Sequence, residues 1–189
     1  MKVNFNNLNF GRKIVAKCET KDKQRVKHDT SIYEYNPRDI EDMKEIQYSK
    51  CTNSIKQDFF KEGYFRRNMP ESKYYAMKNN ETGDIIACAK ITQHYAPDGK
   101  YQGIYTSIDE LEASDEYINS ITPMMGFIAN HAQNHLSKNI ITAQRDDELL
   151  NLGECKFKKQ KEGFWSLRSR AFNECISRAE KRNNLEIII

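Results

Sequence analysis

The sequence has little of what marks membrane or secreted proteins. A helix that crosses a bilayer needs about 18 or more apolar residues in a row, and no such run occurs. The first residues, MKVNFNN, lack the apolar stretch of a signal peptide. No internal repeat and no low-complexity tract is present. We therefore expect a cytoplasmic protein with no membrane partner.

Cysteine is sparse, and its distribution excludes the usual cysteine-based architectures. No C-x-x-C pair occurs, and the five cysteines are scattered as Cys18, Cys51, Cys88, Cys155 and Cys175. An odd, unclustered set argues against a disulfide framework and against a zinc site built from thiolates. We expect these residues to be reduced and to pack as small core side chains.

Metal ligands are equally scarce. His131 and His135 lie four residues apart in a predicted helix and therefore share one face. Their segment, H-A-Q-N-H, lacks the glutamate of the zinc-binding H-E-x-x-H motif, and no third ligand is apparent. We expect no metal cofactor and interpret both histidines as surface or partly buried side chains.

The net charge of +3 is spread unevenly along the chain. Residues 1–30 hold eight Lys and Arg against three acids, and residues 156–184 hold nine against three. Residues 105–116, in contrast, contain five acids and no base. Basic ends can contact nucleic acid or another anion. Because acids are interleaved throughout, ordinary solvated charge is the simpler interpretation, and nucleic acid stays a secondary alternative as a partner.

Composition and length favour one globular domain with a proper core. Of the 189 residues 38% are hydrophobic and 30% charged. Alternating segments predict strands at 13–18 and 31–35, separated by an exposed connection at 21–30. After the second strand, N-P-R-D predicts a helix start with Asn36 as the cap, and this helix runs to about Tyr48.

The rest of the chain completes a mixed α/β pattern. Strands at 73–78 and 84–95 flank an Asn- and Gly-rich turn and form an antiparallel hairpin. A long strand at 104–113 precedes a helix at 121–136 and a short apolar strand at 139–143, which suits a parallel strand buried on both faces. The remaining predicted elements are helical stretches near 54–62 and 146–152, a hairpin from 156–159 and 163–167, a basic amphipathic helix at 169–182 and an apolar tail at 185–189.

This order of elements is similar to that of GNAT-type N-acetyltransferases, and three stretches carry the resemblance. Residues 32–42 (IYEYNPRDIED) resemble the family's opening strand and first helix. Residues 108–117 (IDELEASDEY) resemble its central strand and the turn after it. Residues 139–143 (NIITA) and 151–159 (NLGECKFKK) resemble the strand, helix and hairpin that close the domain.

The resemblance covers residues 31–167. It leaves residues 1–30 as a basic extension with a short strand, and residues 168–189 as an appended C-terminal helix and tail that pack on the domain. It implies a central mixed, mostly antiparallel sheet flanked by helices. It also implies transfer of an acetyl or other acyl group from acetyl-CoA to the amine of a small molecule or protein.

The resemblance places the cosubstrate along the central strand and the helix that follows. In the family, main chain of the splayed central strand holds the pantetheine arm, and amides at the helix N-terminus bind the pyrophosphate. The corresponding residues here are Leu111, Glu112 and Ala113 for the arm, and Asn119, Ser120, Ile121 and Thr122 for the phosphates.

Two features of the family pattern are missing. The family's pyrophosphate turn carries Q/R-x-x-G-x-G/A, whereas residues 117–123 read YINSITP, with no glycine and no basic residue. An anion site there has to rely on polar helix caps, with Pro123 in the first turn. The tyrosine that protonates the leaving thiolate in the family falls near Gly153, which has no side chain to serve.

Carboxylates on the central strand are candidates for the base that takes a proton from the attacking amine. Asp109 and Glu110 stand where several amine acetyltransferases have an acidic pair. Because neighbours on a strand point to opposite faces, we expect only one of them to face the cleft. Glu110 is the first choice and Asp109 the second. The alternatives are a solvent-facing acidic edge, an inactive GNAT-like binding module, and a small nucleic-acid-associated protein, and the oligomeric state is left open.

Overall fold

The computed structural model describes residues 12–48, 72–96, 103–135, 139–142, 152–160 and 165–188. The predicted helices near 54–62 and 146–152 lie largely or wholly outside these ranges. The elements are β1 (Lys13–Asp22), β2 (Lys27–Tyr35), α1 (Ile40–Tyr48), β3 (Ser72–Asn79), β4 (Ile85–Ala96), β5 (Gly103–Ala113), β6 (Tyr117–Ile118), α3 (Ile121–Asn134), β7 (Asn139–Thr142), the 3₁₀ helix η3 (Leu152–Cys155), β8 (Lys158–Lys159), β9 (Trp165–Arg168), the 3₁₀ helix η4 (Ser169–Ala171), α4 (Phe172–Asn183) and β10 (Glu186–Ile187).

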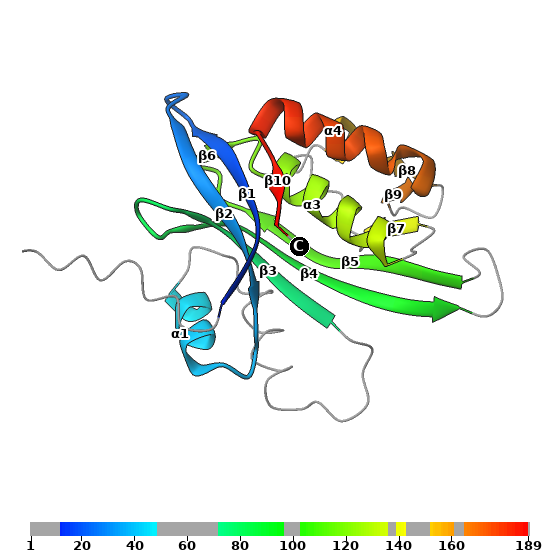
Figure 1. The fold of residues 1–189 in the computed structure, drawn as a ribbon, viewed down its shortest axis with the longest axis horizontal. Coiled ribbons are helices and arrows are strands. Elements are labelled where there is room, and N and C mark those ends of the chain that lie inside the picture. Colours follow the sequence, from blue (N-terminus) through cyan, green and yellow to red (C-terminus); the bar gives the residue numbers. More distant parts are fainter. Residues whose placement is uncertain are drawn as a thin grey trace, which may run out of the picture.

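One twisted sheet forms the centre of the molecule, in the order β10-β1-β2-β3-β4-β5-β7-β9-β8 (Figure 1). Neighbouring strands pair antiparallel except β5 and β7, which pair in parallel. Helices α3 and α4 lie together on one side of the sheet, and α1 lies on the other. The predicted mixed, mostly antiparallel α/β fold is confirmed, and so is the parallel placement of the strands on either side of α3.

Helix α3 is buried on nearly all sides because it lies between the sheet and α4. The sequence predicted one apolar face, yet every residue of Ile121–Ala129 is buried. Helix α4 covers the second face with four buried apolar side chains, Phe172, Cys175, Ile176 and Ala179. The predicted docking of the C-terminal helix is therefore confirmed. None of the helices in the described ranges is long and apolar enough to cross a bilayer.

The approach of α3 to α4 is closest to its steric limit at Gly126. A Cβ atom added there would lie 2.4 Å from Cβ of Ala179 and 2.9 Å from Cδ2 of Leu185. Real Cβ atoms do not come so near, so only glycine allows this separation of the two helices. The position of α3, and of the loop before it, therefore depends on the absence of a side chain at Gly126.

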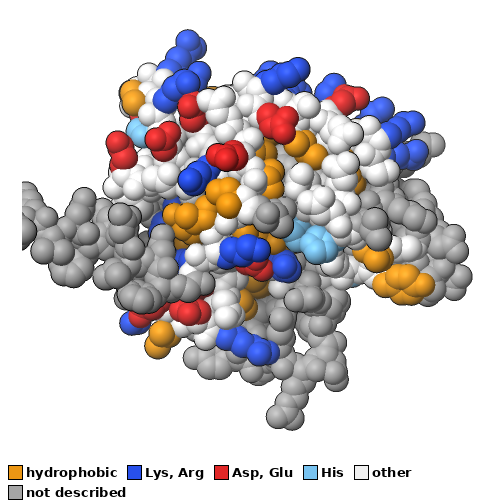
Figure 2. All heavy atoms as spheres, viewed as in Figure 1, with side chains coloured by type: hydrophobic (Ala, Val, Ile, Leu, Met, Phe, Trp, Pro, Cys, Tyr) orange, Lys and Arg blue, Asp and Glu red, His pale blue; other side chains and the backbone are white. Residues whose placement is uncertain are grey.

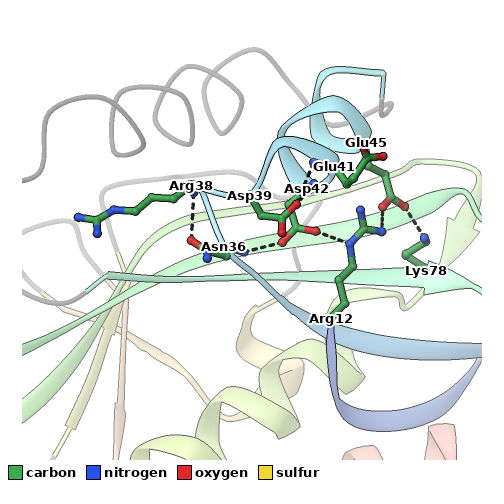
Figure 3. Close-up of polar contacts among 8 residues, drawn as sticks. All are labelled: Arg12, Asn36, Arg38, Asp39, Glu41, Asp42, Glu45 and Lys78. Carbon is green, nitrogen blue, oxygen red and sulfur yellow. Dashed lines mark hydrogen bonds and ion pairs between the residues drawn. The ribbon is translucent and has the colours of Figure 1, made fainter. Parts of the chain in front are cut away.

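Helix α1 begins later than the sequence predicted. Asp39, not Asn36, caps it, because Asp39 Oδ1 accepts hydrogen bonds from the N–H groups of Glu41 (2.8 Å) and Asp42 (3.3 Å) (Figure 3). Asn36 Oδ1 instead accepts the N–H of Arg38 at 3.0 Å and closes a turn before the helix. Asn and Asp can both cap a helix or close a turn. Here Asp39, directly before Ile40, is the cap.

A cluster of charges ties α1 to the sheet (Figure 3). Arg12 contacts the carboxylates of Asp42 and Glu45, and Lys78 of β3 contacts Glu45. Asp42 is 3% exposed and also accepts the N–H of Asn36 at 2.7 Å. Burial, and then the charge of Arg12, lowers the pKa of Lys78. Since each buried charge has an opposite partner, the cluster fixes where α1 lies on the sheet.

The first hairpin and the C-terminal tail contain more strand than predicted. β1 reaches Asp22 and β2 begins at Lys27, so most of the predicted connection at 21–30 is strand. These strand ends are largely exposed and need no apolar face, which is why alternation is lost there. In the tail, β10 extends the sheet, with Ile187 opposite Ala16 of β1.

One cysteine differs from the expected reduced state. Cys18, Cys155 and Cys175 are buried and free, as expected. Cys88 is disulfide-bonded, so the prediction is wrong at this position. Spacing along the sequence carried no sign of this pairing, which depends on proximity in the fold.

Candidate active site

A cavity of about 300 Å³ lies at the N-terminal end of α3, beside the turn that follows β5. Five of the residues that the resemblance assigned to acyl-CoA line it, namely Ala113, Asn119, Ser120, Ile121 and Thr122. The other lining residues are Lys23, Ser114, Asp115, Tyr117, Ile118 and Glu154. Leu111 and Glu112 do not line it and are buried in β5, 5% and 4% exposed. The end of β5 and the start of α3 thus line the same cavity.

The turn before α3 is built without glycine. Asn119 has a φ of +56°, in the left-handed region that Asn tolerates better than most residues. Ser120 occupies the N-cap position but makes no side-chain cap hydrogen bond. The N–H of Thr122 is bonded to the carbonyl oxygen of Asn119 at 3.1 Å. The positive end of the α3 dipole therefore lies at the cavity without a side-chain cap.

The first hairpin holds this turn in place. Tyr117 and Ile118 of β6 pair with Asp22 and Lys21 of β1. The N–H of Lys23 donates to the carbonyl oxygen of Glu116 at 3.1 Å. Through these bonds the first hairpin, which the sequence assigned to a separate basic extension, brings Lys23 of its turn to the cavity.

Two charged residues of the cavity were missed by sequence reasoning. Lys23 comes from the β1–β2 turn, and its ammonium lies 3.8 Å from the carboxylate of Asp115. Glu154 comes from η3, and Arg182 of α4 lies 2.9 Å from its carboxylate. Both lie far from the loop in sequence, and Glu154 was assigned no role although it belongs to the stretch 151–159, so only the fold places them at the cavity.

The described pairing of β5 with β7 reaches the point where the regularity of β5 breaks. In the described residues the parallel pairing with β7 runs from Thr106 to Ile108. In the ladder with β4, Ile91 pairs with Ile108 but Lys90 pairs with Glu110, so Asp109 is an extra residue. Such a β-bulge bends the strand that contains it. Within the described part of the chain, β5 beyond this bulge is paired on the β4 side only.

The bulge also places Asp109 and Glu110 on the same face of the sheet. Ile108 and Leu111 both belong to the core that contains α3, so the two residues between them point away from that core. The prediction that only one of the two carboxylates can face a given side is therefore wrong. The extra residue shifts the alternation of the strand by one position, and two neighbours come to share a face.

Hydroxyl groups hold the carboxylate of Asp109. Ser107 Oγ donates to Asp109 Oδ1 at 2.6 Å, and Thr92 Oγ1 donates to Asp109 Oδ2. His94 Nε2 lies 2.8 Å from Ser107 Oγ and must be the donor, because the single hydroxyl proton goes to Asp109. The His94 ring stacks on Tyr105 with centroids 4.9 Å apart. Asp109 is thus the acceptor at the end of a hydrogen-bonded chain that starts at His94.

The histidines on α3 lie on the opposite side of the sheet from this chain. His131 is 5% exposed, and neither of its ring nitrogens has a hydrogen-bond partner among the described residues. Burial, followed by the charges of His135 and Lys73, lowers the pKa of His131 to about 4. The described ranges contain no group of three or more side chains able to hold a metal ion.

Comparisons with known proteins bear on the fold. No protein-family model matches the sequence, and no curated protein is similar enough to match. Among solved structures the chain is similar to a mutant AtaT toxin bound to acetyl-CoA and to the C-terminus of the antitoxin AtaR. That match has a TM-score of 0.52 and 6% identity, over 79% of this chain and 99% of the other.

Two further solved structures align less closely. The N-acetyltransferase PseH of Campylobacter jejuni matches with a TM-score of 0.47 and 14% identity, over 72% of this chain and 97% of PseH. A mutant of KacT matches with a TM-score of 0.49 and 10% identity, over 77% of this chain and 98% of KacT. At these identities the likeness concerns the fold alone. The match to the AtaT structure, together with the mixed, mostly antiparallel sheet and its flanking helices, agrees with the GNAT-like fold that the sequence predicted.

Proposed function

We propose that the protein transfers an acyl group from acyl-CoA to an amine, by direct attack and without a covalent enzyme intermediate. The observation that carries the proposal is the junction of β5 and α3. There a cavity at an uncapped helix N-terminus adjoins a strand whose main chain, in the described residues, is paired on one side only. The backbone amides at the N-terminus of α3 suit an anion. The main chain of β5, with one side unpaired in the described residues, suits the extended acyl-pantetheine arm.

The cavity fits the diphosphate of acyl-CoA rather than the whole molecule. Its volume of about 300 Å³ is at the lower end for ligand pockets, so the pantetheine arm has to lie outside it, along Leu111–Ala113. The α3 dipole and Lys23 favour the phosphates. Asp115 and Glu154 oppose them, although each has a cation within 4.0 Å. We therefore expect weak affinity compared with enzymes that have a glycine-rich turn.

Glu110 is proposed as the proton acceptor. It lies next to the bulge, on the face of the sheet away from α3, and together with Asp109 it makes that face attractive to a cationic amine. Glu110 takes a proton from the acceptor ammonium, and the neutral amine then attacks the acyl carbonyl carbon. The carbon–sulfur bond breaks, and the nitrogen loses its second proton to solvent. Solvent also protonates the leaving thiolate, because Gly153 offers no side chain for this step.

Calorimetry with acetyl-CoA tests the binding half of the proposal. We expect micromolar binding by the wild type, and an about fivefold weaker affinity in Lys23→Ala, since an exposed charge contact is worth up to about 1 kcal/mol. Lys21→Ala is the matched control, because it removes a lysine of the same hairpin that does not line the cavity. S-acetylpantetheine, which lacks the phosphates, should bind both variants equally.

Turnover measured by thiol release with a panel of amines tests the catalytic half. Glu110→Gln should lower turnover about 10²–10⁴-fold and leave acetyl-CoA binding intact. Glu116→Gln is the control, since it removes a carboxylate from the same acidic stretch beyond β5. Full activity in an Asp109→Asn, Glu110→Gln double variant would refute the assignment of the base. Absence of acyl-CoA binding by the wild type would refute the enzyme and leave a GNAT-like interaction module.

A further inference from the structure

A second cavity, of about 580 Å³, lies where the β8–β9 hairpin meets the start of α4. It shares no lining residue with the cavity at α3. Among the described residues, its lining contains one acid, Glu174, against five cations, namely Lys156, Lys158, Lys159, Arg168 and Arg170. This basic cavity is independent of the proposed acyl transfer, and nothing in that reaction requires it.

The register of the hairpin explains why cations gather there. Ser166 and Arg168 are two residues apart in β9 and so share a face, and Lys158 of β8 pairs with Ser166. Leu167, between the two, is fully buried in the main core. Arg168 and Lys158 therefore lie on the side of the hairpin that points away from that core, and η4 brings Arg170 to the same hollow.

The acid in the cavity compensates only part of this charge. Glu174 lies 3.2 Å from Lys156, and it stands in the first turn of α4, where the helix dipole favours an acid. Lys158, Arg168 and Arg170 form no ion pair within the described ranges. Cations that line one hollow without counter-charges repel one another, and a bound anion removes that repulsion.

A buried hydroxyl adds a directed donor to these charges. Ser166 lines the cavity and is 6% exposed. Its Oγ accepts a hydrogen bond from Nε2 of Gln160 at 2.8 Å. The hydroxyl proton of Ser166 has no acceptor among the described residues, so it is available to an anionic oxygen inside the cavity.

We infer that the basic cavity binds the phosphate groups of a nucleic-acid strand. Arginine forks and lysine ammonium groups match phosphate oxygens, and several cations suit successive phosphates better than a single one. Among the lining residues that the structure describes, none is aromatic and one, Ala171, is apolar, so these residues favour contact with phosphates over stacking with a base. Recognition is therefore of the backbone and independent of sequence.

The surface beyond the cavity is compatible with a strand that extends past it. Lys and Arg side chains lie along α4 at the upper right of Figure 2. Lys181 and Arg182 are exposed in the last turn of this helix. The C-terminal charge that composition presented as ordinary solvated charge is thus concentrated on the hairpin and on the helix beside it.

Fluorescence anisotropy with a labelled polyuridine oligonucleotide tests the inference through its salt dependence. With five phosphate contacts, raising salt from about 50 to about 200 mM should weaken binding about 100-fold, since each contact on a single strand contributes about 0.7 to the slope. Arg168→Ala/Arg170→Ala leaves three contacts, and the same change of salt should then weaken binding about 20-fold. Both arginines are exposed, so the variant should keep the wild-type circular dichroism spectrum.

The matched control is Lys13→Ala/Lys21→Ala, which removes the same charge from exposed positions of β1. It should keep the wild-type salt slope. An unchanged slope in the arginine variant, or an equal change in the control, would overturn the inference. Equal displacement of the RNA by free triphosphate at matched phosphate concentration would assign the cavity to a small phosphate ligand and overturn the nucleic-acid partner. None of these readouts depends on acyl transfer.

Discussion

Replacing Gly126 by alanine tests how far the position of α3 depends on its contact with α4. The new Cβ would lie 2.4 Å from Cβ of Ala179, whereas carbon atoms in contact are about 3.5–4.0 Å apart. Overpacking costs about 1–3 kcal/mol, and alanine gains about 1 kcal/mol over glycine in a helix interior. Because a methyl group cannot rotate out of the way, the upper end of the cost applies. We expect a net loss of about 2 kcal/mol in the free energy of unfolding.

Urea unfolding followed by circular dichroism measures this loss, and a double variant supplies its control. Gly126→Ala/Ala179→Gly moves the methyl group from one helix to the other and removes the worst contact. It should be more stable than the sum of the two single changes implies, by about 1 kcal/mol or more. A Gly126→Ala protein as stable as the wild type, or strictly additive effects, would refute the tight packing of α3 against α4.

Two further predictions concern stability. Burial lowers the pKa of His131 to about 4, below its value of 6.5 in the unfolded state. Between these two pH values the unfolded state binds more protons than the folded state. The free energy of unfolding therefore falls as pH falls. His131→Phe should remove about 2–3 kcal/mol of that fall, measured by urea titrations across this range, while His135→Phe, at an exposed position, should not. Deleting residues 169–189 uncovers α3 and should lower the melting temperature by about 10 °C or more. An unchanged melting temperature would mean that the packing of α4 on α3 does not contribute to the stability of the domain.

The topology could be predicted because its signals are local. The Asn- and Gly-rich segment before β4 forms a tight turn in which Gly83 has a φ of +77°, a conformation that favours glycine. The apolar run at 139–143, which follows a strand and a helix, predicted a parallel neighbour for β5, and β7 is that neighbour. The predicted start of α1 was wrong because Asn36 and Asp39 are both residue types that cap helices. Neighbouring sequence does not decide between them.

The candidate site was less predictable, because it depends on features without a local signal. Nothing in the run I-D-E-L shows which residue is the extra one in the ladder, so the shared face of Asp109 and Glu110 could not be foreseen. Lys23 reaches the cavity only because β1 pairs with β6. The loop residues Asn119 to Thr122 were placed at the cavity by resemblance, since their own sequence lacks the glycines that mark such loops.

The pairing of β1 has a consequence for the order in which the chain folds. The hydrogen bond from Asn183 Nδ2 to the carbonyl oxygen of Glu19 joins residues 164 apart in sequence. β10 then covers the edge of β1 at Ala16 and Lys17. During synthesis β1 therefore leaves the ribosome long before the segment that completes this edge. An uncovered edge strand can pair with other chains, so nascent molecules should aggregate most readily in the interval before α4 and β10 have emerged.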